Sequence, residues 1–329
     1  MSKKKALFIS YDLKDFFGED FRILSKHYDA KSITVAGLFD LIKKKWSIWK
    51  EVGKRDIVVV WFGSMAAFVA TIYARLRKKK SVIISGGFDV LKMKDIKYGL
   101  YLNPIRGFFA SLAFRLCDEI VFFSKDSKYE LKKNAKIDKG VVSYLSVDPK
   151  QFKPAKKKEA LVVTVGVVKR ENLKRKGLET FVKAAEGVPN ARFVLIGRQD
   201  DDSIGYLKSI APPNVLFEDV GHDLNKIAER VGKAKVYVQV SGHEGFGRSL
   251  VEGMSCECVP VVTKRGALPE VVGDTGYYVR FENVEETSKA IKQALTSEKG
   301  KKARKRVLEK FTTKQRESSL INIINRVLE

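Results

Sequence analysis

Short runs of β-branched apolar residues alternate along this chain with stretches in which apolar residues recur every three to four positions. The first pattern is typical of buried strands and the second of amphipathic helices, so together they predict parallel sheets with connecting helices. In the first half, strands are expected at residues 6–10, 32–35, 57–62, 81–85 and 119–123, and helices at 66–77 and 107–116. In the second half, strands are expected at 161–165, 192–196, 215–218, 236–240 and 259–262, and helices at 177–186, 224–233, 249–255 and 284–296.

A polar segment at residues 147–160 separates the two sets of strands and is typical of a linker, because it contains two prolines and three consecutive lysines. We therefore expect an α/β protein with two Rossmann-like doubly wound domains facing a cleft. Their expected bounds are 1–150 and 151–310, followed by a C-terminal helix at 311–329 for which packing back on the first domain is an open arrangement. Ligands of such sheets bind at the carboxyl ends of the strands, so a site is expected in the turns there.

The composition adds a strong positive charge. The formal net charge is +24, and residues 1–153 hold about +15 of it, as 31 Lys and Arg less 16 Asp and Glu. Such a field attracts polyanions, although a lysine-rich solvated surface explains it equally well. No apolar run reaches the roughly 18 residues of a membrane-spanning helix, and residues 6–10 are too short for a signal peptide. The three cysteines are expected to be reduced and buried, which favours a cytoplasmic protein.

The turn after the strand at 236–240 carries the richest chemistry, with the sequence SGHEGFGRSLVE at 241–252. Gly245 and Gly247 allow the close backbone approach and positive φ that an anion cradle requires. A helix beginning near Gly247 would direct free N–H groups at a phosphate or sugar oxygen. Glu244 and Glu252 can face one cleft, where their carboxylates would accept hydrogen bonds from sugar hydroxyls. The alternative is an ordinary glycine-rich turn with a capping glutamate.

Glu244 and Glu252, with Gly-Phe-Gly between them, resemble the E-x7-E signature of the retaining glycosyltransferases of family 4. The segments GMSCECVPVV (253–262), RGALPEVV (265–272) and VDPKQFKP (147–154) resemble further motifs of that family. The resemblance is specific over residues 141–310 and loose over 1–140. It implies a GT-B fold, a nucleotide-sugar donor held by the C-terminal domain, retention at the anomeric carbon, and no metal or other cofactor.

A basic loop, KRENLKRKG at 169–177, follows the strand that ends before Gly166. In the resembled family an Arg and a Lys of this loop grip the donor diphosphate, and the Lys precedes a Gly, which fits Lys176. Arg170 is our choice for the Arg, with Lys169 and Arg175 as close competitors. Cations here would neutralise the diphosphate as it leaves. An exposed basic loop on a basic protein is the alternative.

The resemblance assigns the other donor contacts as well. It implies that the nucleoside lies against the turn at residues 220–222, that Glu252 accepts from the ribose hydroxyls, and that Glu244 meets the transferred sugar. The expected donor-binding set is Gly166, Arg175, Gly221, His222, Gly245, Phe246, Gly247 and Glu252, beside the catalytic set Glu244, Arg170 and Lys176. His222 and His243 are interpreted as ordinary loop residues.

Signals on the acceptor side are weaker. Gly18 occupies the place of the family's glycine-rich first loop, and Gly86 lies in a turn after a strand. Relatives often carry a histidine in this domain that touches the donor sugar, whereas His27 here falls within a helical pattern. Asp89 is a candidate substitute, and the catalytic base is left open. The acidic run at 200–202 is interpreted as a solvated loop and not as a metal site.

Residues 41–50, LIKKKWSIWK, interleave cations with Trp46 and Trp49, and residues 106–109 form a second basic aromatic stretch. Such segments favour an anionic membrane surface. Burial of both tryptophans in the core is an equally supported interpretation. No nucleic-acid-binding module is recognisable, so a nucleic-acid partner is not expected.

The sequence thus predicts a retaining glycosyltransferase that moves a sugar from a UDP- or GDP-sugar to a hydroxyl of a glycan or lipid-linked acceptor. It is expected in the cytoplasm, and peripheral contact at the inner membrane face is open. The alternatives are a GT-B-type phosphorylase or epimerase, which needs no separate acceptor hydroxyl, and a non-enzymatic polyanion-binding protein.

Overall fold

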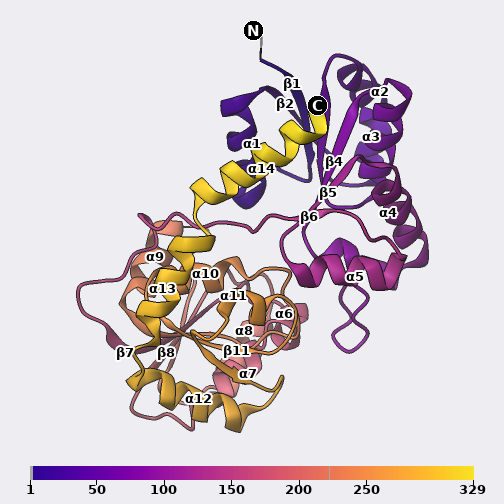
Figure 1. The fold of residues 1–329 in the computed structure, drawn as a ribbon. Helices are drawn as coiled ribbons and strands as arrows, with labels where there is room; N and C mark the ends of the chain where they lie inside the picture. The colour runs from indigo at the N-terminus through magenta and orange to yellow at the C-terminus, as the bar shows by residue number, and fades with distance from the viewer. Residues whose placement is uncertain (1–2, 222) are drawn as a thin grey trace. The chain divides into compact units, whose positions relative to one another are not determined.

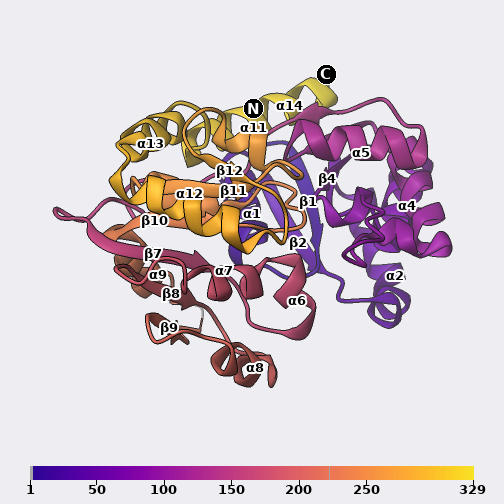
Figure 2. The ribbon, with the colours of Figure 1, turned by 90° about the horizontal axis from the view of Figure 1, so that it is seen from below.

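The computed structural model describes residues 3–221 and 223–329, and the chain divides into two α/β units (Figure 1). Unit 1 comprises Met1–Leu145 together with Lys314–Glu329, and unit 2 comprises Ser146–Thr313. The chain therefore leaves unit 1, builds all of unit 2, and returns to unit 1 with its last helix. Each unit contains a six-stranded parallel sheet flanked by helices (Figure 2).

The sheet of unit 1 has the strand order β2-β1-β3-β4-β5-β6, and every neighbouring pair is parallel. The strands are β1 (Lys5–Ser10), β2 (Asp29–Thr34), β3 (Ile57–Trp61), β4 (Lys80–Ser85), β5 (Glu119–Phe122) and β6 (Val141–Val142). The helices are α1 (Asp15–His27), α2 (Leu38–Gly53), α3 (Met65–Leu76), α4 (Pro104–Leu116), α5 (Lys125–Ala135) and α14 (Thr313–Leu328), with short 3-10 turns η1 (Phe88–Val90) and η2 (Leu100–Leu102). The order reverses between β1 and β3, which makes the carboxyl ends of these strands the switch point where such sheets bind ligands.

The sheet of unit 2 has the order β12-β11-β10-β7-β8-β9, again all parallel. The strands are β7 (Glu159–Val165), β8 (Arg192–Ile196), β9 (Val215–Glu218), β10 (Ala234–Gln239), β11 (Val259–Thr263) and β12 (Tyr277–Val279). The helices are α6 (Arg170–Arg175), α7 (Leu178–Ala184), α8 (Ser203–Ser209), α9 (Leu224–Lys233), α10 (Arg248–Ser255), α11 (Leu268–Val272), α12 (Val284–Thr296) and α13 (Lys299–Lys310). This is the Rossmann order, and its switch point lies between β7 and β10.

Both cores form because the central strands are apolar on both faces, as parallel strands covered by helices must be. In β3, all five residues are buried, and in β11 likewise. Polar residues mark where helices begin. Ser64 accepts a hydrogen bond from the Ala67 amide at the start of α3, and Asn283 accepts one from the Glu286 amide at the start of α12.

The last helix, α14, is held on unit 1 by a buried ion pair. The Arg316 guanidinium donates to both carboxylate oxygens of Asp20 at 3.0 and 2.6 Å, and the two side chains are 1% and 2% exposed. The same guanidinium donates to the Ser143 carbonyl oxygen at 2.8 Å. Near the edge of the helix, Tyr28 donates to Asn325 at 2.6 Å. These bonds join α14 to α1, to Tyr28 between α1 and β2, and to the segment after β6.

The three cysteines are free and buried, and burial raises the pKa of the Cys117 thiol to about 12, as expected of inert thiols. Within residues 3–221 and 223–329, none of the helices combines the length and apolar character that crossing a bilayer requires.

Candidate active site

The switch point of unit 2 gathers the residues that the sequence singled out. β7 and β10 are neighbours, so the segments that follow them leave the same edge of the sheet. One segment leads through α6 to Lys176 and Gly177, and the other leads to Glu244 at the start of α10. Gly177 has a φ of +67°, and a Cβ at this position would lie 2.3 Å from the Val240 carbonyl oxygen. Glycine is therefore required where the two segments approach each other.

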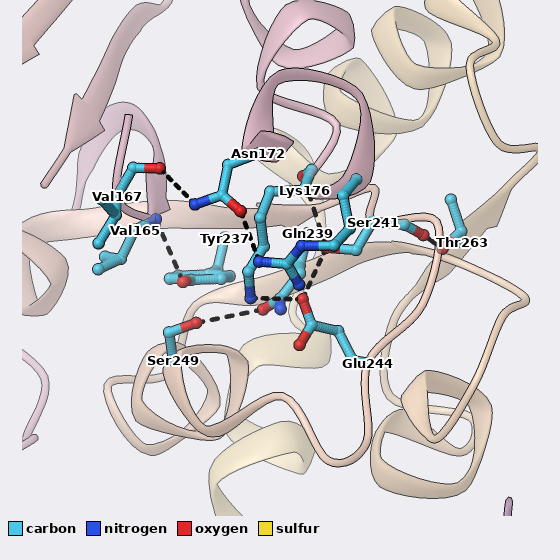
Figure 3. Close-up of polar contacts among 11 residues, drawn as sticks. Val165, Val167, Asn172, Lys176, Tyr237, Gln239, Ser241, Glu244, Ser249 and Thr263 are labelled. Carbon is cyan, nitrogen blue, oxygen red and sulfur yellow. Dashed lines mark hydrogen bonds and ion pairs between the residues drawn. The ribbon is translucent and has the colours of Figure 1, made fainter. Parts of the chain in front are cut away.

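This close approach brings a cation and a carboxylate together. The Lys176 Nζ donates to Glu244 Oε1 at 2.6 Å, and Ser241 Oγ donates to the same oxygen at 2.9 Å (Figure 3). The side chain of Lys176 is 22% exposed and that of Glu244 is 10% exposed. The backbone fixes the same arrangement, because the Gly242 amide donates to the Arg175 carbonyl oxygen at 2.7 Å. Two of the three expected catalytic residues, Lys176 and Glu244, thus lie side by side at the sheet edge.

The surroundings keep Glu244 ionised. Burial by itself would raise the pKa of the carboxyl, but the charges of Lys176 and Arg175, with hydrogen bonds from Lys176 and Gln239, outweigh burial. They hold the pKa of Glu244 at about 2. An ionised carboxylate only accepts hydrogen bonds, so Glu244 is suited to binding hydroxyl groups and not to donating a proton.

The basic segment after β7 is not the loop that the sequence suggested. It folds into the helix α6, and Arg175 in its last turn donates to Asn172 Oδ1 at 2.6 Å. Asn172 in turn donates to the Val167 carbonyl oxygen at 2.8 Å, which ties the helix to the end of β7 (Figure 3). Arg170 is the first residue of α6, and its side chain is exposed. The structure therefore brings Arg175 close to Glu244, while Arg170 lies at the other end of the helix, where its backbone amide donates to Asp201 at 2.9 Å and lowers the pKa of that carboxyl.

The turn around Gly245 and Gly247 leads into α10 as expected. Gly247 has a φ of +87° and is the residue from which the helix begins. Phe246 is 2% exposed and packs edge-on against Phe311 at 5.4 Å, so its backbone is fixed while its ring fills the core. Glu252 is buried to 7% exposure inside α10, and its Oε1 lies 3.3 Å from Arg248 Nε one turn earlier.

Gly266, for which the sequence predicted no role, contacts the backbone of Glu244. Gly266 has a φ of +58°, and a Cβ there would lie 2.5 Å from the Glu244 carbonyl oxygen. The next residue, Ala267, donates its amide to that same oxygen at 2.9 Å. The segment after β11 therefore clamps the backbone of Glu244. The sequence shows a glycine between Arg265 and Ala267. It does not show that this glycine packs against the backbone of Glu244, 22 positions earlier.

The comparison with protein families decides the identity. A family model described as "Glycosyl transferases group 1" matches residues 147–312. The chain belongs to the glycosyl transferases group 1 family. It is therefore a glycosyltransferase. No curated protein matches the sequence.

Solved structures agree with a GT-B fold for this group 1 transferase. HepE from Anabaena, in complex with UDP and glucose, superposes with a TM-score of 0.77 at 16% identity, over 98% of this chain and 99% of that one. Sucrose-phosphate synthase from Thermosynechococcus elongatus gives 0.78 at 15% identity, over 99% of each chain. A glycosyltransferase from Rickettsia africae gives 0.78 at 16% identity, over the whole of both chains. These similarities show that the fold is shared over the full length of the chain, including unit 1.

Two further glycines of the expected donor set lie at strand ends of the transferase. Gly166 follows β7, and its amide donates to the Ile196 carbonyl oxygen at 2.9 Å. Its carbonyl oxygen faces Gly197, where a Cβ would lie 2.2 Å away. Gly221 follows β9 with a φ of +56°, and its amide donates to Asp219 at 2.9 Å. His222 lies outside the described residues.

On the acceptor side, the structure brings Gly86 and Asp89 together but places Gly18 elsewhere in unit 1. Asp89 is fully buried, and its carboxylate accepts from the amides of Gly63 and Gly86 at 2.7 and 3.0 Å and from Ser85 at 3.1 Å. It thereby ties together the ends of β3 and β4, and burial raises its pKa to about 6. Gly18 lies in the first turns of α1 and not in a loop, and a Cβ there would lie 2.4 Å from the Leu13 carbonyl oxygen.

Proposed function

We propose that this transferase moves a sugar from a nucleotide-sugar, a UDP- or GDP-sugar, to an acceptor hydroxyl with retention at the anomeric carbon. The observation that carries the proposal is the contact between Lys176 and the ionised Glu244 at the switch point of unit 2. A nucleotide-sugar presents two chemistries to such a site, a diphosphate that needs cations and a sugar that needs hydrogen-bond acceptors. This site offers both within one contact. The UDP and UDP-glucose bound by HepE support the same class of donor.

In the proposed mechanism, Lys176 and Arg170 neutralise the diphosphate as the glycosidic bond breaks. Arg170 is suited to this because its side chain is exposed at the first residue of α6. Arg175 has a different task, because it donates to Asn172 and its charge helps to keep Glu244 ionised. Glu244 accepts from hydroxyls of the transferred sugar and fixes its orientation, while fixed charges and the departing phosphate stabilise the positive charge that develops on the ring.

The remaining donor contacts follow from the start of α10. The amides of Phe246 and Gly247 are proposed to bind the sugar, and Glu252 to accept from the ribose hydroxyls. The nucleoside is proposed to lie by Gly221 at the end of β9. Retention is proposed to follow from attack on the same face that the diphosphate leaves, without a covalent intermediate on Glu244. No metal or other cofactor is required in this proposal, because Lys176 and Arg170 supply the positive charge.

The acceptor is proposed to be a glycan or a lipid-linked molecule, and the reaction to belong to glycan biosynthesis in the cytoplasm. We further propose peripheral contact with an anionic membrane face through unit 1. Trp46 of α2 is 70% exposed and follows three consecutive lysines, at positions 43–45. Trp49 packs edge-on against Tyr73 at 5.0 Å, so one tryptophan of this segment supports the core while the other is available to a membrane surface.

The test is a thermal-shift screen with UDP, GDP, ADP and their sugars, in buffer containing EDTA. We expect a nucleotide-selective rise in Tm for the intact protein and none for Lys176→Ala. A matched variant, Lys174→Ala, removes another cation of α6 whose ammonium pairs with Glu282, and it should keep the rise. If no nucleotide raises Tm, the donor proposal is wrong. If the rise requires an added divalent cation, the metal-free mechanism is wrong.

A further inference from the structure

Unit 1 contains a pocket of about 530 Å³ that the proposed donor chemistry does not use. It lies at the switch point of the unit 1 sheet, against Ile9 and Ser10 at the end of β1 and Val60 and Trp61 at the end of β3. The first residues of α2, α3 and α4 complete its wall. Its size falls within the range of roughly 300–1,000 Å³ that is usual for pockets holding small ligands.

The wall of this pocket is apolar. Val35, Leu41 and Val60 are buried side chains in it, and Met65 and Phe109 add to the same surface. Three polar residues of its lining are engaged in the protein's own structure, whereas the buried Trp61 Nε1 has no hydrogen-bond partner among the described residues. Ser64 accepts from the Ala67 amide at 3.2 Å, Asn103 accepts from the Arg106 amide at 3.0 Å, and Ser10 donates to the Asp12 carbonyl oxygen at 2.5 Å. Among the residues that line it in the described part of the chain, none is acidic.

Exposed apolar side chains continue from the rim of the pocket onto the surface. Leu38 of α2 and Ile105 of α4 both line the pocket, yet they are 61% and 69% exposed. From Leu38 the apolar positions run along one face of α2, because residues 38, 42 and 46 are four apart. We call the following exposed residues the apolar strip: Leu38, Phe39, Ile42, Trp46, Ile105 and Phe108. A contiguous exposed strip of this kind marks an interaction surface.

Cations accompany the apolar strip. The Lys43 ammonium lies 4.3 Å from the centre of the Phe39 ring, and the Lys45 ammonium lies 5.8 Å from the Trp46 ring. Arg106 lines the pocket beside Ile105. Apolar side chains with cations directly beside them complement the boundary between hydrocarbon chains and anionic headgroups. A sugar or a peptide strand would instead require many hydrogen-bonding groups along the pocket, whereas most of the residues that line it are apolar.

We propose that this pocket binds the hydrocarbon chain of an amphiphilic acceptor whose headgroup is anionic, and that the apolar strip guides that chain in from a lipid layer. This inference rests on the proposed transferase function and names the class of its acceptor. The chain enters past Leu38 and Ile105, its methylene groups displace water from the apolar wall, and Arg106 and the lysines of α2 hold the headgroup outside. The reacting hydroxyl therefore belongs to the headgroup and stays outside the pocket.

The test uses a dansyl-labelled fatty acid as the probe, with fluorescence enhancement as the readout. Ala66 lines the pocket at the start of α3, and Ala66→Trp should fill the space that the chain occupies. We expect this variant to bind the probe about tenfold more weakly, since the loss of two buried methylene groups suffices for that. Ile105→Glu, at an exposed rim position, should weaken binding similarly without affecting the fold.

The matched control is Leu76→Glu, which places the same charge on an exposed apolar residue at the far end of α3 and outside the pocket lining. It should bind the probe as the unmodified protein does. The proposal is overturned if the unmodified protein does not bind the probe, or if Ala66→Trp and Ile105→Glu bind it no more weakly than Leu76→Glu. The nucleotide-induced rise in Tm, measured on the same proteins, tests the donor site separately. If no nucleotide raises the Tm of the unmodified protein, the transferase mechanism is contradicted. If nucleotides raise the Tm but the probe does not bind, only the chain-binding pocket is contradicted.

Discussion

The Lys176 ammonium lies 2.6 Å from the Glu244 carboxylate, although 68 positions of sequence separate the two residues. They lie at one edge of the unit 2 sheet because each follows one of two adjacent parallel strands, β7 and β10. The carboxylate is buried and ionised, and the cation beside it is partly open to solvent. In the proposed function, a donor molecule would meet both charges at this edge of the sheet.

Replacing Glu244 by glutamine keeps the size of the side chain and removes its charge. We expect turnover to fall roughly 100-fold, as for the loss of one well-placed charge-stabilising group. Circular dichroism should be unchanged. Glu229→Gln on α9, which loses an exposed ion pair with Lys233, is the matched control and should retain full turnover. Turnover of Glu244→Gln close to that of the control would remove Glu244 from the mechanism.

Three cations of the α6 segment, Arg170, Arg175 and Lys176, are expected to differ in their effects. Arg170→Ala and Lys176→Ala should raise the donor KM and lower kcat, because both are proposed to touch the diphosphate. Arg175→Ala should act through Glu244 instead, since Arg175 is among the charges that lower its pKa. Its acidic limb of kcat against pH should move upward, while the acidic limb of Arg170→Ala stays in place. An identical pH profile for both variants would contradict this division of roles.

Stability at low pH gives an independent test of the Glu244 environment. The pKa of Glu244 is about 2 in the folded protein and ordinarily 4.5. Because the folded value is the lower one, the ionised carboxylate stabilises the fold above pH 4.5, and this contribution disappears as the pH falls toward 2. The full difference corresponds to about 3 kcal/mol. Urea unfolding should show a gap between the unmodified protein and Glu244→Gln that closes with falling pH, whereas a constant gap would argue against a lowered pKa.

Two glycine substitutions in unit 2 should have opposite effects. Gly177→Ala places a methyl group against the Val240 carbonyl oxygen at a positive φ, so we expect a loss of about 1–3 kcal/mol in the free energy of unfolding. Gly205→Ala in α8 meets no atom within 4 Å and should be neutral or stabilising by up to about 1 kcal/mol. Denaturant titrations of both variants provide the comparison. Equal stabilities would show that the two segments can separate at Gly177 without cost.

Much of this fold follows from the chain pattern, because central strands such as β3 and β11 are uniformly apolar and buried. Edge strands β6 and β12 escaped prediction, since two or three residues carry no periodicity. The helix α6 was missed for another reason. Its sequence, RENLKR, is nearly all polar, and what holds it in place is the bond from Asn172 to the Val167 carbonyl oxygen. Tertiary contacts, and not local pattern, decide such a segment.

The site was predictable as far as local motifs reached. The resemblance to family 4 placed Glu244 and Lys176 in one site, at turns that follow strands, and the structure brings the two side chains into contact. The sequence could not show that Arg175, and not Arg170, lies near Glu244. That difference arises because the segment folds into the helix α6, which the sequence did not predict. The sequence also could not show that Trp46 is exposed while Trp49 packs against the protein. That difference depends on the position of Tyr73 of α3, which contacts Trp49.

The buried pair of Arg316 and Asp20 predicts a large and asymmetric effect on unit 1. Arg316→Met leaves the Asp20 carboxylate buried without its guanidinium, so we expect a loss of about 3–5 kcal/mol in the free energy of unfolding. Arg326→Met breaks an ion pair with Glu119 in which the arginine side chain is 58% exposed, and it should cost under about 1 kcal/mol. Similar losses for both variants, measured by denaturant unfolding, would contradict the importance assigned to burial.

The return of α14 to unit 1 also sets an order of assembly during translation. Arg316 follows every residue of unit 2 along the chain, so the ribosome synthesises the whole of unit 2 before it adds the arginine that neutralises Asp20. Unit 1 therefore cannot complete its fold until all of unit 2 has been synthesised, although most of unit 1 is made first. Nascent chains that stop short of Arg316 would carry a first unit in which the Asp20 carboxylate lacks the guanidinium that compensates its burial.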